Sequence, residues 1–324
     1  MYESHWKLSE RPFENRNDSK YYYPAETHQA ALLKLHYAIE NRRAAALLCG
    51  PGGMGKSLLV ETLKRQLNET YRPISHVVFP AMNAVQMIRY LVAQVGVGGL
   101  GGISSGDVEG REPVGAQDAE RGEPVSAHDA ERRATFNSYD AERRATLGPP
   151  SQDVAADVLA FEHFLRQNLE RQRHAVVVVD EAHLLEQHDL LEPLRLLLNL
   201  AATESVGESA WTLVLVGQPT LLSHVERYHA LDERMGVKCM LNRLLPDEST
   251  AYIQHRLRCV GADTEDIFDY PALERIHALT QGIPRRINRL CDLALMVGYA
   301  EDRTIINAEV IDNVHSDLAP SSVN

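Results

Sequence analysis

The sequence predicts an α/β fold, in which a parallel β-sheet is flanked by helices and followed by a C-terminal all-helical domain. Up to Pro246, short apolar runs alternate with longer amphipathic segments, as in buried parallel strands joined by crossover helices. A glycine-rich loop joins one of these runs to a helix, and after Pro246 the pattern becomes wholly helical. With 324 residues, of which 44% are hydrophobic, the chain is long enough for one large or two modest domains.

The first predicted strand, at 44–49, leads into Gly50-Pro51-Gly52-Gly53-Met54-Gly55-Lys56-Ser57, and an amphipathic helix follows at 58–67. The loop fills every fixed position of the phosphate-binding pattern G-x-x-x-x-G-K-[ST]. Its glycines let backbone N–H groups surround a phosphate at a helix N-terminus, where the helix dipole favours anions. We expect Lys56 to reach the β- and γ-phosphates of a nucleotide and Ser57 to ligate Mg²⁺. The alternative is a glycine turn with no ligand.

A strand at 75–79 and a helix at 84–95 come next, and the composition then changes to Gly, Pro, Ser, Asp, Glu and Arg. Within this stretch an eleven-residue unit repeats at 111–121, 122–132 and 133–143, and a fourth copy stops at Pro149. The copies lack an apolar stripe and two contain Glu-Pro, which does not suit a coiled coil. We predict that 96–151 is a disordered insertion in the nucleotide-binding core. The alternative is a docking loop.

A helix at 153–173 leads to a strand at 175–179, whose four consecutive valines end at Asp180 and Glu181. Acidic residues at the carboxyl end of a buried parallel strand belong to the edge of the sheet where ligands bind. We expect Asp180 to hold the Mg²⁺ shell and Glu181 to take a proton from the water that attacks the γ-phosphate. The pair therefore predicts hydrolysis. The alternative is that both carboxylates cap the next helix, near Leu190.

The remaining segments complete the domain plan. Further strands are expected at 212–216 and 237–241, and helices at 247–260, 270–280, 284–297 and 308–318. This gives an N-terminal segment at 1–43 that packs on the nucleotide site, an ATPase core at 44–245 interrupted by the insertion, a helical lid at 246–318 and a tail at 319–324.

Composition limits the function classes. A net charge of −12 opposes sequence-independent binding to nucleic acid, which needs Lys and Arg to neutralise phosphates, although a local basic patch stays open. The chain starts without a signal-peptide core, and no apolar run approaches the roughly 18 residues of a membrane span. The cysteines have no CxxC spacing and indicate buried thiols in a reducing compartment: Cys49, Cys239, Cys259 and Cys291. We therefore expect a cytoplasmic protein.

A series of segments, in chain order, resembles a known family. They are Pro12-Phe13, the Tyr22 region with His28, the phosphate loop, Asp180-Glu181-Ala182-His183, Gly217-Gln218-Pro219 and Gly282-Ile283-Pro284-Arg285-Arg286-Ile287-Asn288. Together they resemble the ATPases of the general secretion pathway A (ExeA-like) group of AAA+ proteins, whose branch includes transposition-associated ATPases and the nucleotide-binding domains of replication initiators. The resemblance covers almost the whole chain except the repeats. It implies a P-loop NTPase (AAA+) core with a helical lid, ATP and Mg²⁺ as cofactors, and ATP-driven assembly into homo-oligomeric rings.

The resemblance also implies roles for single residues. Gln218 matches the sensor 1 position, where a polar side chain orients the attacking water or touches the γ-phosphate; a turn built by its Gly and Pro neighbours is the alternative. Arg285 matches the sensor 2 arginine, which reaches from the lid to the phosphates, although Arg286 and Arg289 share its neighbourhood. His183 either couples hydrolysis to a partner or simply packs.

An arginine finger, donated to the nucleotide site of a neighbouring subunit, is a further expectation. Arg234 is the candidate, and Arg227 and Arg243 are its rivals. The secretion ATPases carry a transmembrane segment and a peptidoglycan-binding region after the ATPase part, whereas this chain ends at Asn324. A role at the cell wall would therefore need a partner that supplies the membrane link.

Three function classes follow. The first is a ring-forming ATPase that remodels or assembles a protein complex, with secretion as one open context. The second is a DNA-associated ATPase of the transposition type, which needs a basic surface such as the cluster of Arg285, Arg286 and Arg289. The third is a DEAH-type helicase, suggested by residues 180–183 and disfavoured because a second recombinase-like domain is missing.

Overall fold

The structure, a computed structural model, describes residues 2–78, 82–94, 154–200, 208–262 and 267–318. The chain forms two compact units, one made of Met1–Ala84 with Leu165–Asn324 and the other of Val85–Phe164. The predicted insertion at 96–151 and the predicted tail at 319–324 lie outside the described residues, so both stay predictions. The boundaries of the predicted domains also stay predictions.

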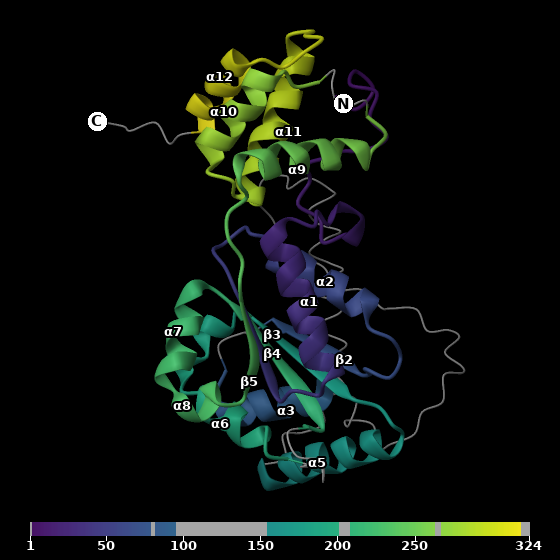
Figure 1. Ribbon diagram of the computed structural model, residues 1–324, viewed down its shortest axis with the longest axis vertical. Helices are drawn as coiled ribbons and strands as arrows, with labels where there is room; N and C mark the ends of the chain where they lie inside the picture. Colours follow the sequence, from purple (N-terminus) through teal and green to yellow (C-terminus); the bar gives the residue numbers. More distant parts are fainter. Residues whose placement is uncertain (1, 79–81, 95–153, 201–207, 263–266, 319–324) are drawn as a thin grey trace, which may run out of the picture. The chain divides into compact units, whose positions relative to one another are not determined.

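The larger unit contains the predicted parallel sheet, which is confirmed. Its strands lie in the order β2 (Ile74–Val78), β3 (Ala175–Asp180), β4 (Trp211–Gly217), β1 (Ala45–Cys49) and β5 (Met235–Met240), and all four pairings are parallel (Figure 1). Every residue of the three central strands is buried, so both faces of these strands are covered. This is why these strands read as continuous apolar runs in the sequence.

Helices α1 (Glu26–Glu40) and α2 (Lys56–Gln66) cover one face of the sheet (Figure 1). Their apolar side chains join those of the strands in one buried cluster. The sequence did not predict α1, although its buried residues recur at helical spacing: Ala31, Leu32, Leu35, Ala38 and Ile39. Three short helices follow the central strands, and the second of them contacts β1: α6 (Leu191–Leu197), α7 (Pro219–Arg227) and α8 (His229–Asp232).

The smaller unit includes nearly all of α3 (Ala84–Gln94) and the first part of α5 (Val154–Glu170), which agree with the helices expected there. The Nε of Arg89 lies 3.3 Å from Oδ2 of Asp157, which ties the two helices together. The rings of Phe161 and Phe164 stack with their centroids 6.5 Å apart. The unit therefore has a polar and an aromatic contact of its own.

The C-terminal helices also match the prediction. They are α9 (Pro246–Arg258), α10 (Tyr270–Thr280), α11 (Pro284–Ala300) and α12 (Ala308–Leu318), gathered around their own core (Figure 1). Aromatic residues from the start of the chain belong to this core, among them Tyr2, Trp6 and Phe13. The indole Nε1 of Trp6 donates to the carbonyl of Leu295 over 3.0 Å. The N-terminal residues therefore help to build the helical region.

Gly282 joins α10 to α11 at a point where no side chain fits. Its φ is +67°, and an added Cβ would lie 2.1 Å from the carbonyl oxygen of Leu244. The N–H of Leu244 donates to the carbonyl of Gly282 over 2.9 Å, which fixes this close approach. The connection between β5 and α9 therefore packs directly on the turn that precedes α11.

Replacing Gly282 by alanine is expected to lower the free energy of unfolding by more than about 2 kcal/mol, because the strained φ and the clash add together. Urea unfolding would measure this loss. Gly261→Ala is the matched control, since Gly261 also has a positive φ of +79° but an added Cβ meets nothing within 4 Å. The control should lose only about 1 kcal/mol. Equal losses in the two variants would contradict the close-approach argument.

Within the described parts of the chain, no helix is both long and apolar enough to cross a membrane. The four cysteines are free thiols. Cys49, Cys239 and Cys291 are buried, as expected, whereas Cys259 is only half-buried because it lies near the end of α9.

Candidate functional site

The glycine-rich loop connects β1 to α2, and two of its residues need glycine. Gly53 and Gly55 have φ values of +80° and +84°, in the left-handed region that other residues rarely adopt. At Gly53 an added Cβ would also lie 2.7 Å from the Cβ of Arg285. The N–H of Arg285 donates to the carbonyl of Gly53 over 3.1 Å, so the loop touches the start of α11.

Lys56 is the first residue of α2 and is buried beneath the loop. Its Nζ donates to the carbonyls of Gly50 and Pro51 over 2.8 and 3.1 Å. Burial lowers the pKa of the Lys56 ammonium, and the nearby carboxylates of Glu181 and Asp180 act in the opposite direction. The loop therefore surrounds one cationic group.

Asp180 ends β3 opposite the loop. Its Oδ2 accepts a hydrogen bond from the Ser57 hydroxyl over 3.2 Å, and its Oδ1 accepts one from the backbone N–H of Glu181 over 2.8 Å. Burial alone would raise the pKa of the Asp180 carboxyl, but contacts with His76, Glu181 and Ser57 outweigh burial and lower the pKa. Asp180 is therefore a carboxylate at neutral pH.

Glu181 follows in the left-handed region, with φ of 52°, and its side chain is 47% exposed. Its Oε2 lies 3.4 Å from Nδ1 of His183, so the histidine contacts the carboxylate that it follows in sequence. The helix-capping alternative is not supported at either end. Asp180 is bonded as described above, and α6 begins after Leu190 without a side-chain cap.

Lys56, Ser57, Asp180 and Glu181 line one cavity of about 320 Å³. The loop and the two carboxylates form one part of its wall, and Arg285 contributes from α11. The residues that sequence reasoning missed come from the N-terminal segment, the connection before α9, and helices α9 and α11: Asn15, Arg16, Asn17, Tyr21, Tyr23, Leu244, Tyr252, Arg256, Pro284 and Asn288. His28 also lines the cavity, and its Nε2 hydrogen-bonds the carbonyl of Met54 over 2.7 Å.

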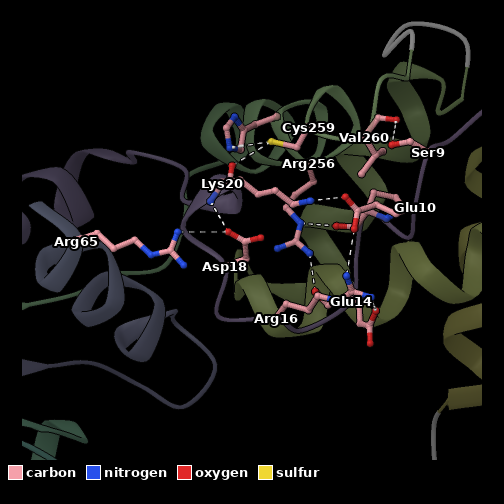
Figure 2. A network of polar contacts seen from close by, with 12 residues as sticks. Ser9, Glu10, Glu14, Arg16, Asp18, Lys20, Arg65, Arg256, Cys259 and Val260 are labelled. Atoms are coloured by element: carbon pink, nitrogen blue, oxygen red, sulfur yellow. Dashed lines mark hydrogen bonds and ion pairs between the residues drawn. The ribbon is translucent and has the colours of Figure 1, made fainter. Parts of the chain in front are cut away.

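A buried arginine fastens the N-terminal segment to α9 (Figure 2). The Nε of Arg256 donates to the carbonyl of Pro12 over 2.5 Å, and a terminal nitrogen donates to the carbonyl of Glu14 over 2.7 Å. The guanidinium also lies over the ring of Tyr21, 4.1 Å from its centroid. Because these bonds end on backbone carbonyls, the sequence carried no sign of them.

The same segment is held to the core from its other side. Arg65 of α2 lies 4.0 Å from Oδ1 of Asp18, and within the segment Glu10 pairs with both Arg16 and Lys20 (Figure 2). Arg65 also donates to the hydroxyl of Ser19 over 2.7 Å. This wall of the cavity is therefore tied to α2 and to α9 at once.

The remaining predicted residues lie further from the cavity. Gln218 follows β4, next to the loop, since the N–H of Gly50 donates to the carbonyl of Gly217 over 3.2 Å. The side chain of Gln218 is exposed and does not belong to the cavity lining in the described part of the chain. Arg286 and Arg289 are exposed on α11, and of the three neighbouring arginines it is Arg285 that lines the cavity.

Arg234 lies at the amino ends of the parallel strands, whereas the loop lies at their carboxyl ends. It precedes Met235, which pairs with Ala45 at the start of β1, whereas the loop follows the end of β1. A five-residue strand spans about 16 Å, so Arg234 is remote from the nucleotide loop of its own chain. Its rivals are engaged elsewhere in the chain: Arg227 pairs with Glu186 over 3.0 Å, and Arg243 donates to Gln281 over 2.6 Å.

Comparison with known sequences gives two findings. Residues 39–225 match the sequence profile of a family described as AAA domain. General secretion pathway protein A of Aeromonas hydrophila is 29% identical over 305 residues, which cover 93% of this chain and 45% of that protein. This chain therefore spans less than half the length of the curated relative that it matches.

Solved structures give the same fold at low sequence identity. The ORC2 protein of Aeropyrum pernix, in ADPNP-ADP complexes, matches with a TM-score of 0.62 and 14% identity, over 98% of this chain and 73% of that one. The ORC1 protein of Aeropyrum pernix, in complex with DNA, matches with a TM-score of 0.55 and 14% identity, over 95% and 68% of the two chains. At such identities the likeness shows the fold alone.

Proposed function

Because the chain belongs to the AAA domain family, we propose that it binds ATP in the cavity beside the glycine-rich loop and hydrolyses it, with Mg²⁺, to ADP and phosphate. One observation carries this proposal. Lys56, Ser57, Asp180 and Glu181 come from the ends of two neighbouring elements and line the same cavity, where Arg285 faces them from α11.

The residues at the start of α2 and at the end of β3 suit Mg²⁺. The Ser57 hydroxyl and the Asp180 carboxylate present oxygen atoms 3.2 Å apart, and Mg²⁺ prefers oxygen ligands. When bound there, the ion would neutralise charge on the β- and γ-phosphates. The backbone N–H groups of the loop would hold the phosphates, and the Lys56 ammonium would lie against them.

Glu181 is the proposed general base. Its half-exposed carboxylate lines the cavity beside Asp180, where it can accept a proton from a water that attacks the terminal phosphate. Arg285 is the proposed sensor of the phosphates from α11, because it lines the cavity and its backbone already contacts the loop. Gln218 keeps its proposed role at the end of β4, which requires its side chain to turn toward the cavity.

The proposed biological role is the ATP-driven remodelling or assembly of a protein complex by a homo-oligomer in the cytoplasm. The 29% identity to General secretion pathway protein A, extending over 93% of this chain, supports a secretion-related context. The net charge of −12 favours a protein target over nucleic acid.

The experiment that tests the proposed activity compares purified wild type with Lys56→Ala. We expect wild type to release phosphate from ATP and Lys56→Ala to lose nucleotide binding, because the ammonium group that the loop surrounds is removed. Phosphate release and binding of a fluorescent ADP would measure both effects. Lys64→Ala is the matched control, since Lys64 lies on the same helix but pairs with Glu61 over 2.9 Å. Equal activity of wild type and Lys56→Ala would contradict the proposal.

A DNA-associated ATPase is the second candidate, and the exposed Arg286 and Arg289 on α11 favour it. The Aeropyrum pernix ORC1 protein of the same fold was solved in complex with DNA. Measuring ATP hydrolysis with and without duplex DNA at low and high salt separates the two candidates. Strong stimulation that salt abolishes would support the DNA-associated role, and a rate unaffected by DNA would support the protein-remodelling role.

A further inference from the structure

His76 stands in the middle of the edge strand β2, and the register of the sheet brings it close to Asp180. His76 pairs with Val178 of β3, and Val78 pairs with Asp180. Side chains two residues apart on a strand point to the same face, so His76, Val178 and Asp180 share one face. This is the face that α2 covers, since Val178 belongs to the cluster that contains Leu59 and Leu63 of α2.

The ring of His76 lies beside the carboxylate, within ion-pair distance but beyond hydrogen-bond distance. Its Nε2 lies 3.7 Å from Oδ2 of Asp180, and the two side chains are 22% and 8% exposed. From α2, Ser57 bonds the same Oδ2, and Glu61 interacts electrostatically with His76. The imidazole is therefore in contact with a carboxylate on β3 and within electrostatic range of a carboxylate on α2.

The two oxygens of Asp180 have different partners. Oδ1 accepts a hydrogen bond from the backbone N–H of Glu181, and a side-chain substitution at His76 does not remove this donor. Oδ2 contacts the Ser57 hydroxyl and the ring of His76. Of the two groups at Oδ2, only His76 comes from outside the phosphate loop and its helix. The orientation of Oδ2 toward Ser57 thus depends on the contact with His76.

We propose that His76 is a positioning residue for the Mg²⁺ complex: it holds Oδ2 of Asp180 beside the Ser57 hydroxyl, so that both oxygens face the metal together. The inference rests on the proposed nucleotide site and adds to it a residue from a strand that carries no nucleotide motif. Partners that orient a metal ligand without touching the metal typically change metal affinity by about 10- to 100-fold. His76 acts through Asp180 and touches neither the phosphates nor the water.

The test measures binding of a fluorescent ADP analogue to the full chain, first in EDTA and then as Mg²⁺ is added. His76→Leu fills the space without an N–H, and we expect it to raise the Mg²⁺ concentration at half-effect by about 10-fold. Binding in EDTA should not change, because the loop is intact. His76→Gln keeps an N–H donor at similar reach and should stay close to wild type. Hydrolysis by His76→Leu should approach the wild-type rate when Mg²⁺ is raised.

His36→Leu is the matched control. His36 lies on α1, is 24% exposed and contacts the carboxylate of Glu40 over 3.2 Å, so it resembles His76 in burial and partner but not in place. The control should leave the Mg²⁺ dependence of binding unchanged. Thermal unfolding of each variant shows that the comparison is made on folded protein.

The outcomes separate this inference from the proposed function. If wild type binds ADP and Mg²⁺ strengthens the binding, but His76→Leu shows the same Mg²⁺ dependence, the positioning role is wrong and the nucleotide site stands. If His76→Leu and His76→Gln shift the Mg²⁺ dependence equally, the N–H contact is not the cause and the inference is also overturned. If wild type binds no nucleotide with or without Mg²⁺, the proposed function fails and the inference falls with it.

Discussion

Glu181→Gln is expected to lower the rate of ATP hydrolysis by a factor of about 10²–10⁴, the usual contribution of a positioned general base, while ATP binding stays close to wild type. Glutamine keeps the shape of the side chain but cannot accept the proton of the attacking water. The loop, Lys56 and Asp180 are unchanged, so the groups that bind the phosphates remain in place. Steady-state phosphate release and equilibrium binding of ATP would measure the two effects separately.

Glu192→Gln is the control for this change. The side chains of Glu192 and Glu181 are equally exposed, at 47%, but Glu192 pairs with Arg195 and lies outside the nucleotide cavity. It should hydrolyse ATP at the wild-type rate. Wild-type turnover in Glu181→Gln would remove Glu181 from the role of base, and weakened ATP binding would place it among the binding groups instead.

The second large effect is expected in a mixture of two inactive variants. Arg234→Ala should lower hydrolysis by on the order of 10³-fold if Arg234 acts as an arginine finger, and Lys56→Ala should be inactive for want of bound nucleotide. Arg234 is remote from the loop of its own chain, so it can act only on a neighbouring copy. In a mixture, the Lys56→Ala subunit still supplies Arg234 to a partner whose loop is intact. Hydrolysis should therefore partly recover.

The rival arginines give the control for the mixture. Arg227→Ala and Arg243→Ala should hydrolyse ATP at close to the wild-type rate. Mixing either of them with Lys56→Ala in the same proportions should therefore give no recovery of hydrolysis. Activity per subunit should also rise with protein concentration, because each complete site needs two chains. Mixtures that stay as inactive as their components, together with wild type that remains monomeric in ATP, would refute both the finger and the oligomer.

The sheet and the loop were predictable because their causes are local. A strand buried on both faces must be apolar throughout, and four valines before Asp180 therefore identify β3 without any knowledge of its neighbours. The phosphate loop depends on glycines at fixed spacing, which the chain displays directly. The parallel sheet and the C-terminal helices accordingly match the expectation to within a few residues at their ends.

The N-terminal segment was expected to pack on the nucleotide site, but the particular residues in the rest of the cavity wall were not predictable because their contacts are distant in sequence. Arg256 reads as one charge on an amphipathic helix, and only the fold brings it to the carbonyls of Pro12 and Glu14. His76 gains its neighbour Asp180 from the register of β2 against β3, which no pattern within β2 specifies. Gln218 and Arg234 stay predictions, since the part each plays depends on a rotated side chain or a second subunit.

Because Trp6 is buried among the C-terminal helices, it can pack only after those helices have been synthesised. Trp6 bonds Leu295 and Tyr2 bonds Asp292, so these partners are separated by 289 and 290 residues along the chain. At about 5–20 residues per second, a ribosome needs at least some 15 s to synthesise the residues between them. Through that interval the N-terminal aromatic side chains have no finished core to enter, although the strands of the sheet are already emerging. The nascent chain therefore leaves Tyr2 and Trp6 exposed to chaperones until α11 emerges.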